Sequence, residues 1–148
     1  MMTEPIFTYS QPEENNGYLL WQVSMRWQLQ MNQRLRVVGL TLTQFSLLAG
    51  LYWLSRQGEV VTQQRLADYA HVDRMMTSKV LQTLEKKGLL ERGTNAQDGR
   101  AKQLHLLPAG ETLLRHAYTL VQEVDTTFFG PVQAEATVFN RLMQQLAE

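Results

Sequence analysis

Apolar side chains recur at helical spacing along most of the chain. The first such segment covers residues 18–38, where Leu19, Val23 and Trp27 follow one another at four-residue intervals. Residues four apart share one face of a helix, so this spacing predicts a long first helix. Residues 1–17 contain two prolines, paired glutamates and an Asn-Asn-Gly run, and they are expected to form a loose arm.

A second helix is predicted after either Thr41 or Thr43. Both are residue types that cap helix N-termini, and Gln44 follows Thr41 at the spacing of a capping box. Apolar residues cover much of the circumference of this segment as far as Leu54, so the helix is expected to be buried. It should end near Gly58, because glycine suits the position after a helix C-terminus.

Two short helices are predicted to follow with almost no linker between them. Thr62 can cap a helix over residues 63–70, in which Leu66 would face inward. Asp73 can cap the next helix, and only His71-Val72 lies between the two. Two helices joined by so short a turn, the second more basic, indicate a helix-turn-helix.

The helix after Asp73 has two chemically different faces when it is projected at 100° per residue. Met76, Val80 and Leu84 gather on one side, with Leu81 at its edge, and are expected to be buried. The residues predicted for the opposite side are Met75, Ser78, Lys79, Gln82 and Lys86. Such side chains can bond base edges or phosphates and touch a thymine methyl, although a merely solvated helix face is equally compatible with them.

A β-hairpin is predicted after this helix. Residues 89–92 and 102–107 have strand character, and residues 95–100 form a polar turn containing glycine and asparagine. Leu104 and Leu106 should share one face by two-residue alternation.

Arg100 would lie near the tip of this hairpin, where a guanidinium can enter the negatively charged minor groove of DNA. Asp98 can bond that guanidinium and hold it extended. A turn-forming aspartate that bonds its own backbone is the alternative interpretation.

The C-terminal third is predicted to hold two more helices, separated at Gly130-Pro131 because proline fits a first helical turn. The apolar stripe expected for the earlier helix consists of Leu113, Ala117, Leu120, Val124 and Phe128, with Leu114 and Val121 on an adjoining face. The last helix has its own apolar side, formed by Val132, Val138, Phe139, Leu142, Met143 and Leu146. From the residues alone, it can fold back on its own domain or meet a second chain.

Composition and charge narrow the class of protein. The chain has 148 residues and a net charge of zero, but segments 1–20, 21–70, 71–107 and 108–148 carry −3, +3, +3 and −3. Positive charge in the middle suits a phosphate partner. The absence of cysteine excludes disulfides and thiolate metal sites. No apolar run approaches the roughly 20 residues of a membrane span and no signal peptide is evident, so we expect a cytoplasmic protein.

Several short segments occur in an order that resembles one family. They are Leu42-Thr43-Gln44-Phe45, Leu66-Ala67, the run from Thr77 to Gly88, Asp98-x-Arg100-Ala101-Lys102, Leu104-x-Leu106 and Pro108-Ala109-Gly110. This set resembles the multiple-antibiotic-resistance regulator (MarR) family of bacterial winged helix-turn-helix repressors. The pair Met75-Met76 departs from it, since many relatives have at least one polar residue there, and this leaves the base preference open.

The resemblance implies a mainly α fold with a small β-hairpin wing. Residues 41–107 would form a winged helix-turn-helix domain, and residues 18–40 and 108–148 a helical dimerisation region. The partners implied are double-stranded DNA and a second copy of the chain. The DNA-binding residues predicted from pattern and resemblance together are Gln63, Gln64, Arg74, Met75, Ser78, Lys79, Gln82, Lys86, Asp98, Arg100 and Lys102.

The resemblance also implies a small, commonly aromatic acid as effector, bound between the dimer helices and the winged domain. The candidate side chains for such a site are Trp21, Met25, Arg26, Tyr52, Trp53 and His116. Aromatic residues and methionine would supply an adaptable apolar wall, and Arg26 could hold a carboxylate. At each of these positions a role in the protein core is the competing interpretation.

The function predicted is that of a homodimeric DNA-binding transcriptional regulator, a repressor on a pseudo-palindromic operator that a small molecule releases. The alternative is a winged-helix protein–protein interaction module that binds no DNA. The chain lacks a nucleophile elbow, a phosphate loop and metal-ligand spacing, and its three histidines are scattered. We therefore expect neither an enzyme nor a metal or cofactor site.

Overall fold

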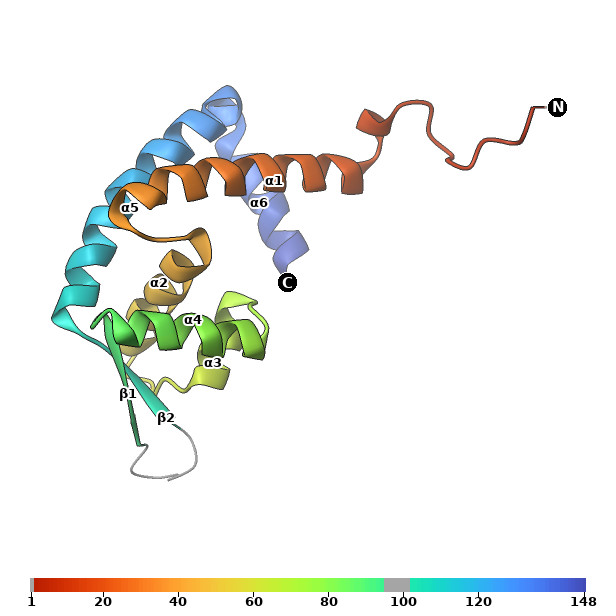
Figure 1. Cartoon of the computed structure of the whole chain (residues 1–148). Helices are drawn as coiled ribbons and strands as arrows, with labels where there is room; N and C mark the ends of the chain where they lie inside the picture. Colours follow the sequence, from red (N-terminus) through yellow and green to blue (C-terminus); the bar gives the residue numbers. More distant parts are fainter. Residues whose placement is uncertain (1, 95–101) are drawn as a thin grey trace.

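The computed structural model describes residues 2–94 and 102–148, and the predicted hairpin-tip residues Asp98 and Arg100 lie outside these ranges. The elements are the α-helices α1 (Asn16–Leu35), α2 (Leu42–Arg56), α3 (Gln63–Ala70), α4 (Arg74–Lys86), α5 (Pro108–Phe129) and α6 (Ala136–Ala147), the strands β1 (Leu90–Thr94) and β2 (Lys102–Leu106), and the 3-10 turns η1 (Pro12–Glu14), η2 (Arg36–Val38) and η3 (Gly130–Glu135). The predicted mainly α fold with a hairpin wing is confirmed. Figure 1 shows α3, α4 and the hairpin at one end of the molecule, α1 and α6 at the other, and α5 running from the hairpin to α1 and α6.

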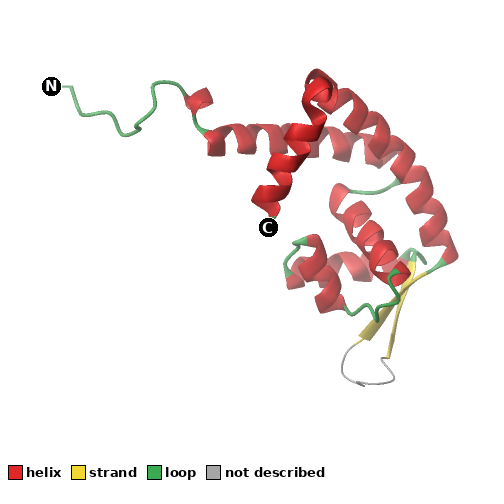
Figure 2. Ribbon diagram, turned by 180° about the vertical axis from the view of Figure 1, so that it is seen from behind, coloured by secondary structure: helices red, strands yellow, loops and turns green. Residues whose placement is uncertain are grey.

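Helix α1 begins at Asn16, inside the segment expected to be a loose arm. Asn15 causes this earlier start, because its side chain accepts a hydrogen bond of 2.8 Å from the backbone N–H of Tyr18. Farther along, α1 packs against α5, and the Trp27 indole N–H donates to Asp125 at 2.8 Å. The preceding chain extends away from the rest of the molecule in both views (Figures 1 and 2).

Helix α2 forms the centre of the core. Thr41 caps it, and the predicted capping box with Gln44 is present. Leu47, Leu48 and Leu51 are fully buried, because α2 packs against α3, α4, α5 and β2. The prediction of a buried second helix is therefore confirmed.

Helices α3 and α4 form the predicted helix-turn-helix. Thr62 caps α3 by accepting from the backbone N–H of Arg65, and Asp73 caps α4 by accepting from that of Met76 at 2.8 Å. His71, between them, has a left-handed backbone with φ of 54°. The sharp reversal lets the Val72 N–H donate to a carbonyl of α3, so the two helices are tied together at their junction.

The buried stripe of α4 differs from the one predicted. It consists of Thr77, Leu81 and Leu84, whereas Met76 is 47% exposed and Val80 is only partly buried. The prediction left Thr77 out of the buried stripe because hydropathy counts threonine as polar. In the fold its hydroxyl donates to the Val72 carbonyl at 3.5 Å, and this contact allows the side chain to be buried.

The hairpin pairs β1 and β2 in antiparallel register, from Leu90 opposite Leu106 to Thr94 opposite Lys102. The first strand begins one residue later than expected. Leu104 is buried and Leu106 packs partly against the core, so their predicted common face is confirmed. The Leu104 N–H also donates to the carbonyl of Val61, which attaches the hairpin to the segment before α3.

The buried residues of helix α5 are Gly110, Leu114, Ala117 and Val121. Leu114 and Val121, which were predicted to lie beside the main apolar stripe, are therefore at the centre of the buried face. The difference arises because α5 packs against both α1 and α2, and these two helices need two adjoining apolar faces. Helix α6 has no buried residue and packs mainly against η3, which argues against its folding back on the core. No single helix in the described ranges passes a length and hydropathy test for a membrane span, although the bent pair of residues 16–38 and 42–56 passes it jointly.

Candidate DNA-binding surface and effector pocket

The face of α4 that points away from the core is exposed and cationic. Met75 is 80% exposed, and Lys79, Gln82 and Lys86 are also exposed. These four positions share one side of the helix at 100° per residue, opposite the buried stripe. We call them the α4 face. Ser78, predicted to belong with them, lies at its border and is partly buried.

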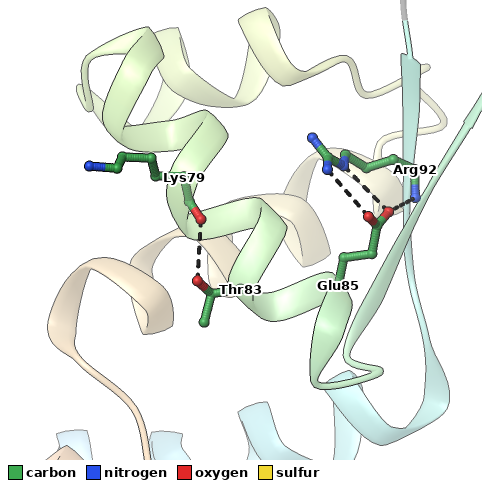
Figure 3. A network of polar contacts seen from close by, with 4 residues as sticks. All are labelled: Lys79, Thr83, Glu85 and Arg92. Carbon is green, nitrogen blue, oxygen red and sulfur yellow. Dashed lines mark hydrogen bonds and ion pairs between the residues drawn. The ribbon is translucent and has the colours of Figure 1, made fainter.

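The cations of the α4 face have no acidic partner among the described residues. Figure 3 shows the Lys79 side chain extending away from the helix, while its backbone carbonyl accepts a hydrogen bond from the Thr83 hydroxyl at 3.3 Å. An ammonium that no carboxylate neutralises is available to a phosphate or to the acceptors of a base edge.

An ion pair fixes the base of the hairpin to α4. The Arg92 guanidinium donates to both carboxylate oxygens of Glu85, at 3.3 and 3.2 Å, and the Arg92 backbone N–H donates to the same carboxylate at 3.0 Å (Figure 3). Arg92 is mostly shielded from solvent, with a side-chain exposure of 17%. The contact sets the position of β1 relative to the α4 face. No local spacing rule predicts it, because the two residues belong to different elements.

The remaining predicted DNA-binding residues occupy several elements. Gln63 and Gln64 lie in the first turn of α3, and Arg74 is the exposed first residue of α4. The backbone of Lys102 begins β2. The first turns of α3 and α4 thus bring polar side chains and backbone N–H groups to the same end of the molecule as the α4 face, an arrangement that suits phosphate contacts.

A pocket of about 330 Å³ lies between α2 and α5. Its walls are Phe45, Ala49, Tyr52, Trp53, Glu111, Leu114, Arg115 and Tyr118. Tyr52 and Trp53 were predicted for an effector site, and they meet edge to face with ring centroids 5.8 Å apart. The volume and the aromatic lining suit a small apolar or aromatic molecule.

Two guanidinium groups lie at or near this pocket. Arg115 donates to Glu111 at 2.6 Å, and that hydrogen bond together with the carboxylate charge raises the pKa of Arg115 above its ordinary value. Arg56 lies over the Tyr52 ring at 5.4 Å from the centroid. Both cations are held by their partners in positions near the aromatic wall.

Four of the predicted effector residues do not line this pocket. Trp21, Met25 and Arg26 are exposed on α1, and His116 is exposed on α5. Sequence reasoning instead missed Phe45, Glu111, Arg115 and Tyr118. A signal for them exists, since residues 45, 49 and 52 of α2 and residues 111, 115 and 118 of α5 have the spacing of one helix face.

A helix-turn-helix that presents an exposed cationic helix face beside a two-stranded hairpin defines a winged helix-turn-helix protein. Residues 40–102 match the MarR family. The uncharacterized HTH-type transcriptional regulator YdcH of Bacillus subtilis (strain 168) is 36% identical over 138 residues, 93% of this chain and 94% of the relative. The chain therefore belongs to the MarR family of transcriptional regulators.

Two solved structures illustrate the likeness of fold. One is a mutant MarR from E. coli complexed with operator DNA, with a TM-score of 0.78 and 22% identity, covering 89% of this chain and 93% of that one. The other is CouR from Rhodococcus jostii RHA1 bound to p-coumaroyl-CoA, with a TM-score of 0.80 and 24% identity, covering 93% of each chain.

Proposed function

We propose that this regulator binds a pseudo-palindromic operator as a homodimer and inserts the α4 face into the major groove. The observation that carries the proposal is the pair of cations on that face, Lys79 and Lys86, which have no acidic partner in the described ranges. Lys79 and Gln82 would bond base edges, and Met75 would touch a thymine methyl. The fold shared with a MarR protein complexed with operator DNA supports this orientation.

Phosphate contacts would come from the surroundings of the α4 face. Gln63 and Gln64 at the start of α3 and Arg74 at the start of α4 would hold the DNA backbone. Asp98 and Arg100 lie outside the described residues, and with Lys102 they stay predicted wing contacts. These interactions would set the register of the protein on DNA, and the α4 face would supply sequence preference.

The homodimer is proposed because one part of the molecule exposes many apolar side chains. On α1 and α6 these are Leu19, Leu20, Trp21, Val23, Met25, Leu29, Val138, Leu142, Met143 and Leu146. So many exposed large apolar side chains on two helices indicate an interaction site. We propose that a second copy of the chain covers these side chains. The resulting dimer would hold two α4 faces about 34–36 Å apart, which is one helical turn of DNA.

A salt titration separates DNA binding from the alternative of a protein-interaction module. An operator duplex is first obtained by selection from random DNA. Each phosphate contact releases counterions, so about six contacts would weaken binding by roughly 10³-fold between 50 and 200 mM salt. Failure to enrich any duplex, or an affinity indifferent to salt, would favour the protein module.

Replacing Gln82 with alanine tests the proposed base reading. We expect operator binding to weaken by about 1–3 kcal/mol and the preference at one base position of each half-site to relax. A binding selection performed with the variant measures both effects. Thr83→Ala is the matched control, since Thr83 is exposed on the same helix and its hydroxyl bonds the Lys79 carbonyl. An unchanged base preference in Gln82→Ala would remove Gln82 from the reading set.

We further propose that the regulator is a repressor that a small aromatic acid releases from DNA. The acid would enter the pocket between α2 and α5, with its ring against Tyr52 and Trp53 and its carboxylate near Arg115. Binding would favour a different spacing of the two α4 faces. A regulator that acts on chromosomal DNA works in the cytoplasm, and we place the protein there.

Filling the pocket tests its role. Leucine in place of Ala49 adds volume to the wall, so a panel of substituted benzoates should raise the melting temperature of the parent protein and leave that of Ala49→Leu unchanged. Thr112→Leu, at an exposed position of α5, is the control and should respond like the parent. Equal responses of Ala49→Leu and the parent would place the effector elsewhere.

A further inference from the structure

The first turn of α4 exposes two neighbouring thioethers. Met75 is 80% exposed and Met76 is 47% exposed, whereas Met31 in the core is fully buried. We propose that Met75 and Met76 are a site of reversible oxidation by hypochlorous acid and related two-electron oxidants, and that the oxidation releases the operator. This inference rests on the proposed DNA binding by the α4 face.

Hypochlorous acid and water are the only reagents that the oxidation of a thioether requires. The thioether sulfur attacks the chlorine of hypochlorous acid to give a chlorosulfonium ion and hydroxide, and water then replaces chloride at sulfur. The net change converts the thioether and hypochlorous acid to a sulfoxide, chloride and a proton. Sulfur loses two electrons and chlorine gains two. Methionine sulfoxide reductases reverse the modification, so the site can return to its starting state.

The surroundings of the pair favour this reaction. Arg74 precedes Met75 in the sequence and is exposed, and Lys79 lies one turn along the same side of α4. Neither cation has an acidic partner in the described part of the chain, and both thioethers are open to uncharged hypochlorous acid from solvent. The chain has no cysteine, so no thiol of its own competes for the oxidant.

Other exposed methionines occupy different surfaces. Met25 and Met143 belong to the apolar faces of α1 and α6 that the proposed dimer covers, and Met2 lies in the N-terminal arm. Oxidation at Met2 would leave the α4 face unchanged, which makes this residue a suitable internal control.

Oxidation of Met75 and Met76 should weaken DNA binding because of where these residues lie on α4. A methionine side chain on the α4 face offers an apolar surface to a thymine methyl, whereas a sulfoxide brings a polar acceptor oxygen to a groove lined by phosphates. Both copies of a dimer would lose the contact. We expect operator affinity to fall by about tenfold or more, the size of effect that a mismatched base contact produces.

The test compares the full chain with Met75→Leu/Met76→Leu, which preserves side-chain size but has no thioether, and with Met2→Leu as control. Each protein is treated with equimolar hypochlorous acid, oxidised residues are identified by mass spectrometry, and affinity is measured on the selected operator duplex. The parent and Met2→Leu should lose affinity and regain it with methionine sulfoxide reductase. The affinity of the double variant should not change on treatment, whatever its value in the untreated protein.

Two results would overturn the inference. One is unmodified Met75 and Met76 in treated parent protein, and the other is equal loss of affinity in the parent and the double variant. A different result would refute the proposed function itself: untreated parent protein that binds no selected duplex. Because the mass spectrum and the affinity of untreated protein are measured independently, the two failures are distinguishable.

Discussion

The substitution Gly110→Ala is expected to lower the free energy of unfolding by about 3 kcal/mol. A Cβ atom on Gly110 would lie 2.1 Å from the carbonyl oxygen of Leu89 and 2.8 Å from a methyl of Leu106. The Leu89 carbonyl has little freedom to move, since it accepts a hydrogen bond from the Leu107 N–H at 3.0 Å. The first turn of α5 or the base of the hairpin must therefore shift.

Urea denaturation at one fixed protein concentration measures this loss. Gly93→Ala is the matched control, because a Cβ on Gly93 would lie at an ordinary 4.0 Å from its nearest neighbours, the Gln103 carbonyl oxygen and the His105 ring. The control should unfold at the midpoint of the parent or slightly above it. Equal midpoints for Gly110→Ala and the parent would contradict the close packing of α5 on the hairpin base.

Reversing the charge of Lys79 is expected to have the largest effect on DNA binding. Glutamate there removes a donor to base edges and brings a carboxylate toward the phosphates, in both copies of the dimer. At about 1–3 kcal/mol for each copy, operator binding should weaken by roughly 2–6 kcal/mol. Folding should be nearly unaffected, because Lys79 is exposed and pairs with no acidic residue in the described ranges.

Fluorescence anisotropy with the selected operator measures the effect of Lys79→Glu. Arg36→Glu makes the same change in net charge at an exposed residue of η2, which lies outside the α4 face and shares a hollow with Lys87 at the end of α4. This control should lose far less affinity, since only the general electrostatic attraction changes. Similar losses in the two variants would mean that overall charge, and not the α4 face, governs binding.

Local signals in the sequence account for most of the secondary structure. Thr41, Thr62 and Asp73 act as the helix caps that were predicted, because capping depends on contacts only three residues apart. The same rule was overlooked at Asn15, and α1 consequently begins earlier than expected.

The orientation of helices about their own axes was harder to predict. In α4 the buried stripe contains Thr77 and leaves Met76 partly exposed, and in α5 packing against both α1 and α2 brings Leu114 and Val121 to the centre of the buried face. A hydropathy pattern cannot show that the Thr77 hydroxyl bonds a backbone carbonyl, or that α5 packs against two helices. The polar positions of α4 were nevertheless found, because charged side chains remain at the surface whichever neighbour covers the apolar stripe.

The pocket shows a further limit of sequence reasoning. Its walls come from α2 and α5, which are about 60 residues apart in the sequence and meet only in the folded chain. Tyr52 and Trp53 were identified as aromatic residues on a central helix, but Arg115 and Tyr118 required knowledge of which face of α5 meets α2. The ion pair of Glu85 with Arg92 likewise depends on tertiary packing.

The proposed dimer binds two half-sites on one face of DNA through two copies of the α4 face. Footprinting on the DNA that flanks the protein's own gene tests this binding mode. We expect a protected inverted repeat whose half-sites lie about one helical turn apart, with the protection lost in Lys79→Glu. Absence of any protected site, or a footprint without two-fold symmetry that Lys79→Glu reproduces, would contradict it.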